Sequence, residues 1–171
     1  MVASSAPPRV GSRAYAELAA RLFGGADSRK AVAFASVNPG EGVTRTVRGV
    51  AAELVRCGKT VATLDGTVET QPIILGAPRI AEPETPATMI AKLRERYDYL
   101  LFDCGSLESS VDLLRVAPLA DGVVMIVEAG RTGKDQLSHA TRLIREANGA
   151  VVGCVLNKRS YPIPAWLYRH L

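Results

Sequence analysis

The stretch from Ala31 to Lys59 (AVAFASVNPGEGVTRTVRGVAAELVRCGK) restricts the possible folds of this chain more than any other segment. An apolar run, Val32–Ala35, predicts a short buried strand, and a glycine-rich turn follows it. A helix is expected to begin at Thr44 and to end at Gly58. Its apolar stripe consists of Val47, Val50, Ala51 and Leu54. Because the turn and the helix N-terminus both present backbone N–H groups, the stretch predicts a binding site for a phosphate.

The turn lacks one part of the full phosphate-loop pattern. That pattern is G-x-x-x-x-G-K-[ST], in which the lysine reaches the outer phosphates and the hydroxyl residue holds magnesium. Here Gly42 is followed by Val43 and Thr44, so the hydroxyl is present and the lysine is missing. Arg45 is positively charged, but one step along a helix turns its side chain by about 100° from the phosphate side. A lysine from elsewhere in the chain is the other source of charge to consider.

The composition is that of an ordinary globular domain. With 171 residues, 47% of them hydrophobic and 22% charged, the chain is expected to form one domain over residues 12–171 after a disordered lead over residues 1–11. The net charge of +4 is mild and aromatic residues are few, so a nucleic-acid platform is not indicated. No apolar run approaches the roughly 20 residues of a membrane span. Cys57, Cys104 and Cys154 are far apart and odd in number, which favours buried thiols over disulfides or a zinc site.

Strands and helices are expected to alternate along the rest of the chain. Further strands are predicted at Thr60–Leu64, Ile73–Leu75, Tyr99–Phe102, Gly122–Val127 and Val151–Leu156. Further helices are predicted at Ser12–Phe23, between Pro86 and Arg96, at Ser109–Leu119, from Thr132 to Ala147, and in a short tail at Pro162–Leu171. Thr132 and Asp135 form a capping pair at the start of one of them. The alternation predicts an α/β domain with a mainly parallel sheet and helices on both faces.

Polar residues follow four of the predicted strands. They are the phosphate loop, Asp65, Asp103 and Asn157. In parallel sheets of this kind, ligands bind outside the carboxyl ends of the strands. The sequence therefore predicts one rim of the sheet that carries all four.

Five segments resemble the bacterial tyrosine kinase family. They are SVNPGEGVT (36–44), VATLDG (61–66), YDYLLFD (97–103), APLADGVVMIV (117–127) and VVGCVLN (151–157). The family consists of cytoplasmic P-loop domains of the MinD/ParA-like type, which work with membrane proteins that control exopolysaccharide or capsule polymerisation and export. The resemblance runs in order from Tyr15 to Leu171 and implies a P-loop NTPase-like fold, shortened between Asp65 and Tyr97.

The resemblance implies roles for individual residues. The phosphate cradle corresponds to Pro39, Gly40, Glu41, Gly42, Val43 and Thr44, and the adenine-reading asparagine to Asn157. Catalytic carboxylates correspond to Asp65, Asp103 and Asp112. The implied ligands are ATP or ADP with magnesium, the metal being held by Thr44 and Asp103. The candidates for autophosphorylation are Tyr161 and Tyr168.

The chain also departs from the family pattern. Val43 replaces the Walker lysine, Thr67 replaces the second aspartate of the A′ motif, and Gly105-Ser106 replace the proline pair after Asp103. On the first helix, the Glu-x-x-Arg-x-x-Arg oligomerisation motif corresponds to Arg13, Ala16 and Ala19. These changes predict weak or absent binding of ATP, ADP and magnesium, and a monomer or weak dimer.

Three functional hypotheses follow. The leading one is a degenerate P-loop domain, a pseudokinase or pseudo-ATPase, that acts as a regulatory or structural partner in exopolysaccharide synthesis and export. Its partner would be a cytoplasmic segment of an inner-membrane copolymerase or chain-length protein, with the chain cytoplasmic and its association with the membrane left open. The alternatives are an active ATP-dependent tyrosine autokinase and a MinD/ParA-like positioning protein. Whether the chain is an enzyme depends on the consequence of Val43, which favours a protein without kinase activity.

Overall fold

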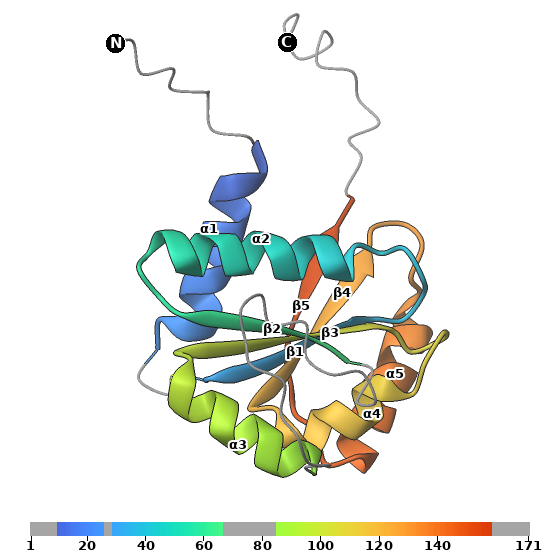
Figure 1. Cartoon of the computed structure of the whole chain (residues 1–171). Helices are drawn as coiled ribbons and strands as arrows, with labels where there is room; N and C mark the ends of the chain where they lie inside the picture. Colours follow the sequence, from blue (N-terminus) through green and yellow to red (C-terminus); the bar gives the residue numbers. More distant parts are fainter. Residues whose placement is uncertain (1–9, 26–28, 67–84, 159–171) are drawn as a thin grey trace, which may run out of the picture.

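A parallel sheet organises the computed structural model, which describes residues 10–25, 29–66 and 85–158. Its strands are β1 (Ala31–Ser36), β2 (Val61–Asp65), β3 (Tyr99–Ser106), β4 (Gly122–Glu128) and β5 (Val151–Asn157). They lie in the order β2-β3-β1-β4-β5, and every pair of neighbours is parallel. The strand that leads into the phosphate loop is therefore the central one, and all five carboxyl ends meet at one edge (Figure 1).

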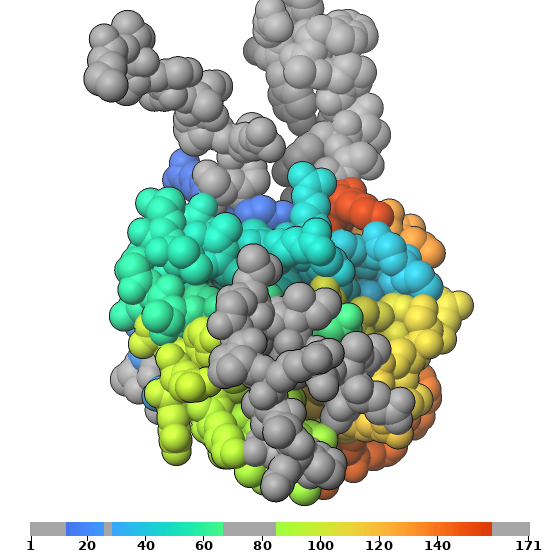
Figure 2. All heavy atoms as spheres, in the orientation of Figure 1, coloured from blue at the N-terminus to red at the C-terminus, as the bar shows by residue number. Residues whose placement is uncertain are grey.

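Helices cover both faces of this sheet, as the sequence predicts (Figure 1). The helices are α1 (Val10–Phe23), α2 (Val43–Arg56), α3 (Pro86–Arg96), α4 (Asp112–Val116) and α5 (Lys134–Glu146), with one 3₁₀ turn at Ala117–Leu119. Helices α1 and α2 pack on one face, and α3, α4 and α5 pack on the other. The outer sides of α2 and α3 form much of the surface seen in Figure 2.

Strand β1 is buried along its whole length. Val32 and Phe34 point into the core beneath α1 and α2, whereas Ala31, Ala33 and Ala35 point into the core beneath the other three helices. A strand covered on both faces needs apolar residues at every position, which explains the unbroken apolar run in the sequence. The phosphate loop is thus anchored at the rigid centre of the domain.

Several element boundaries differ from the sequence predictions, and β3 extends to Ser106 although its predicted end is Phe102. Helix α1 begins at Val10 and α2 at Val43, each within two residues of the expected start. Helix α4 begins only at Asp112, three residues later than predicted. The reason is local, because the Ser110 hydroxyl accepts a hydrogen bond from the Asp112 N–H at 3.0 Å and holds the preceding residues in a turn.

Two sequence predictions are wrong. Thr132 does not cap α5, because the helix begins at Lys134 and Gln136 closes its first turn by accepting from the Gly133 N–H at 2.9 Å. The three cysteines are not all buried either, since Cys57 and Cys154 are exposed and Cys104 alone of them is buried. Cys57 lies where α2 ends, and Cys154 lies on β5 at the edge of the sheet, where less of the fold covers it.

Several predictions fall outside the described residues. They are residues 1–9 of the disordered lead predicted over residues 1–11, the strand Ile73–Leu75, the tail helix Pro162–Leu171, and the tyrosines Tyr161 and Tyr168. Residues 10 and 11 of that lead belong to α1 instead. Within the described part of the chain, none of the helices combines the length and apolar character needed to cross a bilayer.

Close packing of α1 on α2 yields the first testable prediction. A Cβ at Gly49 would lie 2.5 Å from two ring carbons of Tyr15. We therefore expect Gly49→Ala to lower the free energy of unfolding by about 1–2 kcal/mol, because overpacking outweighs the helix propensity of alanine. In a Tyr15→Ala background the same substitution should instead stabilise the domain by up to about 1 kcal/mol. Urea denaturation of the four proteins measures both effects, and stabilisation in the wild-type background would contradict the packing argument.

Candidate functional site

The phosphate loop connects β1 to α2 at the carboxyl edge of the sheet (Figure 1). Gly40 and Gly42 adopt positive φ angles of 79° and 99°, which residues with a side chain rarely adopt. Within the described residues, the N–H groups of Gly40, Gly42, Val43 and Thr44 have no protein acceptor. Consecutive N–H groups without partners, at a helix N-terminus, are the donors that a phosphate needs. The backbone cradle predicted from the sequence is therefore present.

Glu41 holds the loop from inside. Its side chain is completely buried, and Oε2 accepts hydrogen bonds from the N–H groups of Val37 and Asn38 at 3.1 and 3.2 Å. Oε1 accepts from the Thr132 hydroxyl, from the Asn38 amide at 3.3 Å and from the Glu128 N–H at 3.4 Å. Burial raises the pKa of Glu41, but these hydrogen bonds outweigh it and keep the pKa below its ordinary value. Glu41 is therefore ionised, and its hydrogen bonds hold the phosphate loop against the end of β4.

Asn157 contacts the loop directly. Its Nδ2 donates to the Glu41 carbonyl at 2.8 Å, and a Cβ on Gly42 would lie 2.3 Å from that nitrogen. The side chain that the family resemblance assigns to adenine is thus engaged with the loop backbone in this structure. The adenine-reading role stays a prediction.

Val43, at the position of the missing lysine, is a core residue. Its side chain is 6% exposed and belongs to the apolar cluster between α2 and the sheet, with Val47 and Val50. The next residue, Thr44, is exposed at the start of α2. The Thr44 hydroxyl, for which a magnesium-binding role is predicted, therefore lies at the surface, while the Val43 side chain before it points into apolar packing.

The predicted carboxylates lie close together at the same edge. Asp65 and Asp103 are register partners on the neighbouring strands β2 and β3. Burial raises the pKa of the Cys104 thiol, and the carboxylates of Asp103, Asp112 and Asp65 raise it further. Asp65 and Asp103 therefore lie side by side at this edge, and the buried Cys104 next to Asp103 is kept as an unreactive thiol.

These residues suit a magnesium-bound nucleotide only in part. Among the described residues, no group of three or more histidine, cysteine, aspartate or glutamate side chains could hold a metal by itself. Magnesium bound with a nucleotide does not require such a group, because one or two carboxylates, phosphate oxygens and water complete its shell. Thr44 and Asp103 are the residues that would hold the ion, and the free N–H groups would hold the phosphates. The positive charge normally supplied by the lysine is the part that the loop itself lacks.

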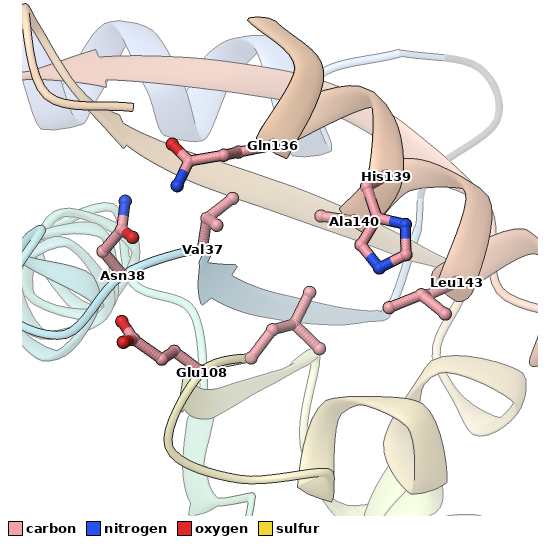
Figure 3. A pocket seen from close by; sticks show the side chains of 8 residues that line it. Val37, Asn38, Glu108, Gln136, His139, Ala140 and Leu143 are labelled. Carbon is pink, nitrogen blue, oxygen red and sulfur yellow. The ribbon is translucent and has the colours of Figure 1, made fainter. Parts of the chain in front are cut away.

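A cavity of about 390 Å³ adjoins the loop on the α5 side (Figure 3). Its apolar lining comes from Val37, Leu107, Ala140 and Leu143. Its polar lining comes from Asn38, Glu108, Gln136 and His139. The Asn38 side chain therefore lies between this cavity and Glu41.

The sequence predictions missed the loop between β4 and α5. Glu128, Arg131 and Thr132 all contact the phosphate loop or its carboxylate. No motif in the sequence marks these residues as contacts of the phosphate loop, because they reach it only through the parallel pairing of β1 with β4. The sequence predicts the strands but not their order in the sheet. That order decides which loop lies beside the phosphate loop.

Parts of the chain are similar in sequence to a succinoglycan transport protein and to tyrosine-protein kinases. No protein-family model matches the chain. It is 40% identical over 75 residues to the succinoglycan biosynthesis transport protein ExoP of Rhizobium meliloti (strain 1021), a match that covers 42% of this chain and 9% of ExoP. It is 29% identical over 72 residues to the putative tyrosine-protein kinase CapB of Staphylococcus aureus, covering 42% of this chain and 32% of CapB. It is 22% identical over 176 residues to the tyrosine-protein kinase CpsD of Streptococcus pneumoniae serotype 4, covering 77% of each. The chain thus spans only a small part of ExoP and about a third of CapB.

Solved structures share the fold at low sequence identity. The chimerical protein CapA2B2 superposes with a TM-score of 0.73 at 17% identity, over 92% of this chain and 88% of that one. The kinase domain of Escherichia coli tyrosine kinase ETK gives 0.64 at 12% identity, over 80% and 71%. MinD of Pyrococcus horikoshii, complexed with Mg-ADP, gives 0.58 at 17% identity, over 82% and 76%. The structural likenesses confirm the predicted P-loop NTPase-like fold, and the sequence relatives confirm the predicted resemblance. The chain has the fold of bacterial tyrosine kinase domains and of MinD, and parts of its sequence are similar to ExoP, CapB and CpsD.

Proposed function

We propose that the chain is a degenerate P-loop domain, a pseudokinase, that serves as a regulatory or structural partner in bacterial exopolysaccharide polymerisation and export. The observation that carries the proposal is Val43, buried in the core at the lysine position. Loss of a positioned cation removes a main source of transition-state stabilisation in phosphoryl transfer, on the order of a hundredfold in rate. The cradle and the sheet edge around it are retained, which supports a binding role without rapid chemistry.

The proposed partner is a cytoplasmic segment of an inner-membrane copolymerase or chain-length protein. The names of the relatives support this choice, because ExoP is a succinoglycan transport protein and CapB and CpsD are named as tyrosine-protein kinases. The chain would act at the cytoplasmic side of the inner membrane, as a monomer or weak dimer. Light scattering measures the assembly state, and a stable ring-sized species would contradict it.

Deletion and complementation test the function. Loss of the gene should change the yield or the chain length of the exopolysaccharide, measured by size-exclusion chromatography of the secreted polymer. The Tyr161→Phe, Tyr168→Phe double variant should restore the wild-type polymer, because a pseudokinase needs no acceptor tyrosine. Unchanged polymer in the deletion strain would contradict a role in polysaccharide export.

An active tyrosine autokinase is the second candidate, supported by the pairing of Asp65 with Asp103 on neighbouring strands at the edge that carries the phosphate loop. It predicts magnesium-dependent phosphotyrosine at Tyr161 or Tyr168, detectable by mass spectrometry and absent in Asp103→Asn. It also predicts that the double phenylalanine variant fails to restore the polymer. Either result would replace the pseudokinase proposal.

A further inference from the structure

Two carboxylates lie at the phosphate loop. Glu41 places an ionised, completely buried carboxylate within the loop, and Glu128 places a second carboxylate at the end of β4. Val43 contributes no charge. With these three residues alone, the loop would repel a phosphate, because like charges at close range disfavour binding.

Arg131 reaches the loop from the β4–α5 connection. Its Nη1 donates to the Pro39 carbonyl at 3.1 Å and lies 3.3 Å from Oε2 of Glu128. Pro39 immediately precedes Gly40, where the run of unpartnered N–H groups begins, so the guanidinium binds the loop backbone at the residue before those groups. The side chain is 50% exposed. Within the described residues, its Nε and Nη2 have no acceptor, so donors remain for a ligand.

Lys158 adds a second cation to the same cluster. Its Nζ lies 3.2 Å from the Glu128 oxygen that Arg131 also contacts. The Glu128 carboxylate is thus shared by two cations, so the cluster of Arg131, Lys158 and Glu128 keeps a net positive charge beside the loop. Arg131 is the one that touches the loop itself, whereas the contact of Lys158 is with Glu128.

We propose that Arg131 supplies, from the β4–α5 loop, the positive charge that the phosphate loop lacks at Val43, and that it pairs with the phosphates of a bound nucleoside diphosphate or triphosphate. A guanidinium suits this role because its fork of donors matches phosphate oxygens and it stays charged at every physiological pH. The inference rests on the proposed function in treating the loop as the binding site, and it goes further by naming the residue that neutralises the charge of the phosphates.

Calorimetric titration of ADP with magnesium into the full chain tests the proposal. Arg131→Ala should weaken binding about tenfold or more, as expected for the loss of a charged hydrogen bond. Arg131→Gln can still donate to the Pro39 carbonyl but carries no charge, and it should bind as weakly as Arg131→Ala. Arg131→Lys should recover part of the affinity. Arg145→Ala removes the same charge from the exposed far end of α5 and should bind like wild type.

Salt dependence gives a second readout. The dependence of log affinity on log salt concentration should become shallower in Arg131→Ala and Arg131→Gln, because one ionic contact to phosphate is lost. Wild-type affinity in Arg131→Gln would show that the arginine only shapes the loop, and would overturn the proposal. Equal weakening of ADP binding by Arg145→Ala would overturn the proposal too, since the effect would then not be specific to Arg131. Absence of ADP binding to the wild-type chain would also overturn the proposal for Arg131, but it would not contradict the role in polysaccharide export. Unchanged polymer in the deletion strain would contradict that role without contradicting the proposal for Arg131.

Discussion

Replacing Glu41 with alanine is expected to lower the free energy of unfolding by about 3–5 kcal/mol, the range for removing one partner of a buried charged network. The substitution would leave the half-buried N–H groups of Val37 and Asn38 and the half-buried Thr132 hydroxyl without their acceptor. Each unsatisfied donor costs about 1–3 kcal/mol, so the loss is concentrated in the phosphate loop and at the end of β4. Guanidinium denaturation of wild type and variant measures the difference.

Glu108→Ala is the matched control. Glu108 is an exposed glutamate beside the same cavity, so its replacement should change the free energy of unfolding by no more than about 0.5 kcal/mol. If Glu41→Ala were as mild as this control, the carboxylate would not be holding the loop.

The pH dependence of stability carries a second signature of Glu41. Its folded pKa is lower than its unfolded value, so the carboxylate stabilises the domain fully above the unfolded pKa of about 4.3. That contribution is lost as the pH falls through the folded pKa. We therefore expect the gap in stability between wild type and Glu41→Gln to shrink on acidification below about pH 4. A gap that stays constant from pH 7 to pH 3 would show that Glu41 is not ionised in the fold.

Val43→Lys is expected to strengthen binding of ADP with magnesium by about tenfold to a hundredfold. A lysine here completes the phosphate-loop pattern, and one positioned donor is worth about 3 kcal/mol when the site is dry. The gain has a cost, because Val43 is buried among apolar residues and the lysine stem must run out of that cluster. We expect the unliganded domain to lose about 1–3 kcal/mol of stability as a result.

Val43→Met separates the two effects. Methionine has a long flexible stem without the charge, so it should bind ADP no better than wild type. Equal affinity of Val43→Lys and wild type would mean that the loop geometry, or the charge of Arg131, already meets the requirement. Calorimetry gives the affinities and thermal unfolding gives the stabilities.

Much of the architecture could be predicted because it depends on local patterns. The unbroken apolar runs at β1 and β4 are typical of strands covered on both faces, and glycines with positive φ at Gly42 and Gly58 mark the turns. The predicted meeting of Asp65 with Asp103 at one edge follows from the parallel direction of their strands, and the register confirms it. The catalytic and nucleotide-binding roles of these residues remain predictions.

Predictions failed where a side chain acts over a long distance in sequence. Thr132 has the spacing of a helix cap, but its hydroxyl bonds to Glu41, which is 91 residues away. The spacing of Thr132 and Asp135 cannot predict this hydrogen bond, because Glu41 comes close to Thr132 only after β1 and β4 have paired.

The sequence by itself determined that this chain is a parallel α/β domain with a phosphate loop, and that the loop has lost its lysine. Both conclusions depend on periodicity and on adjacent residues, which the chain specifies locally. Tertiary structure alone decided that Val43 packs in the core, that Glu41 is buried and holds the loop, and that Arg131 lies against the loop. The physical reason is that burial and charge balance depend on which strands lie side by side, and the order β3-β1-β4 is set by packing of the whole sheet.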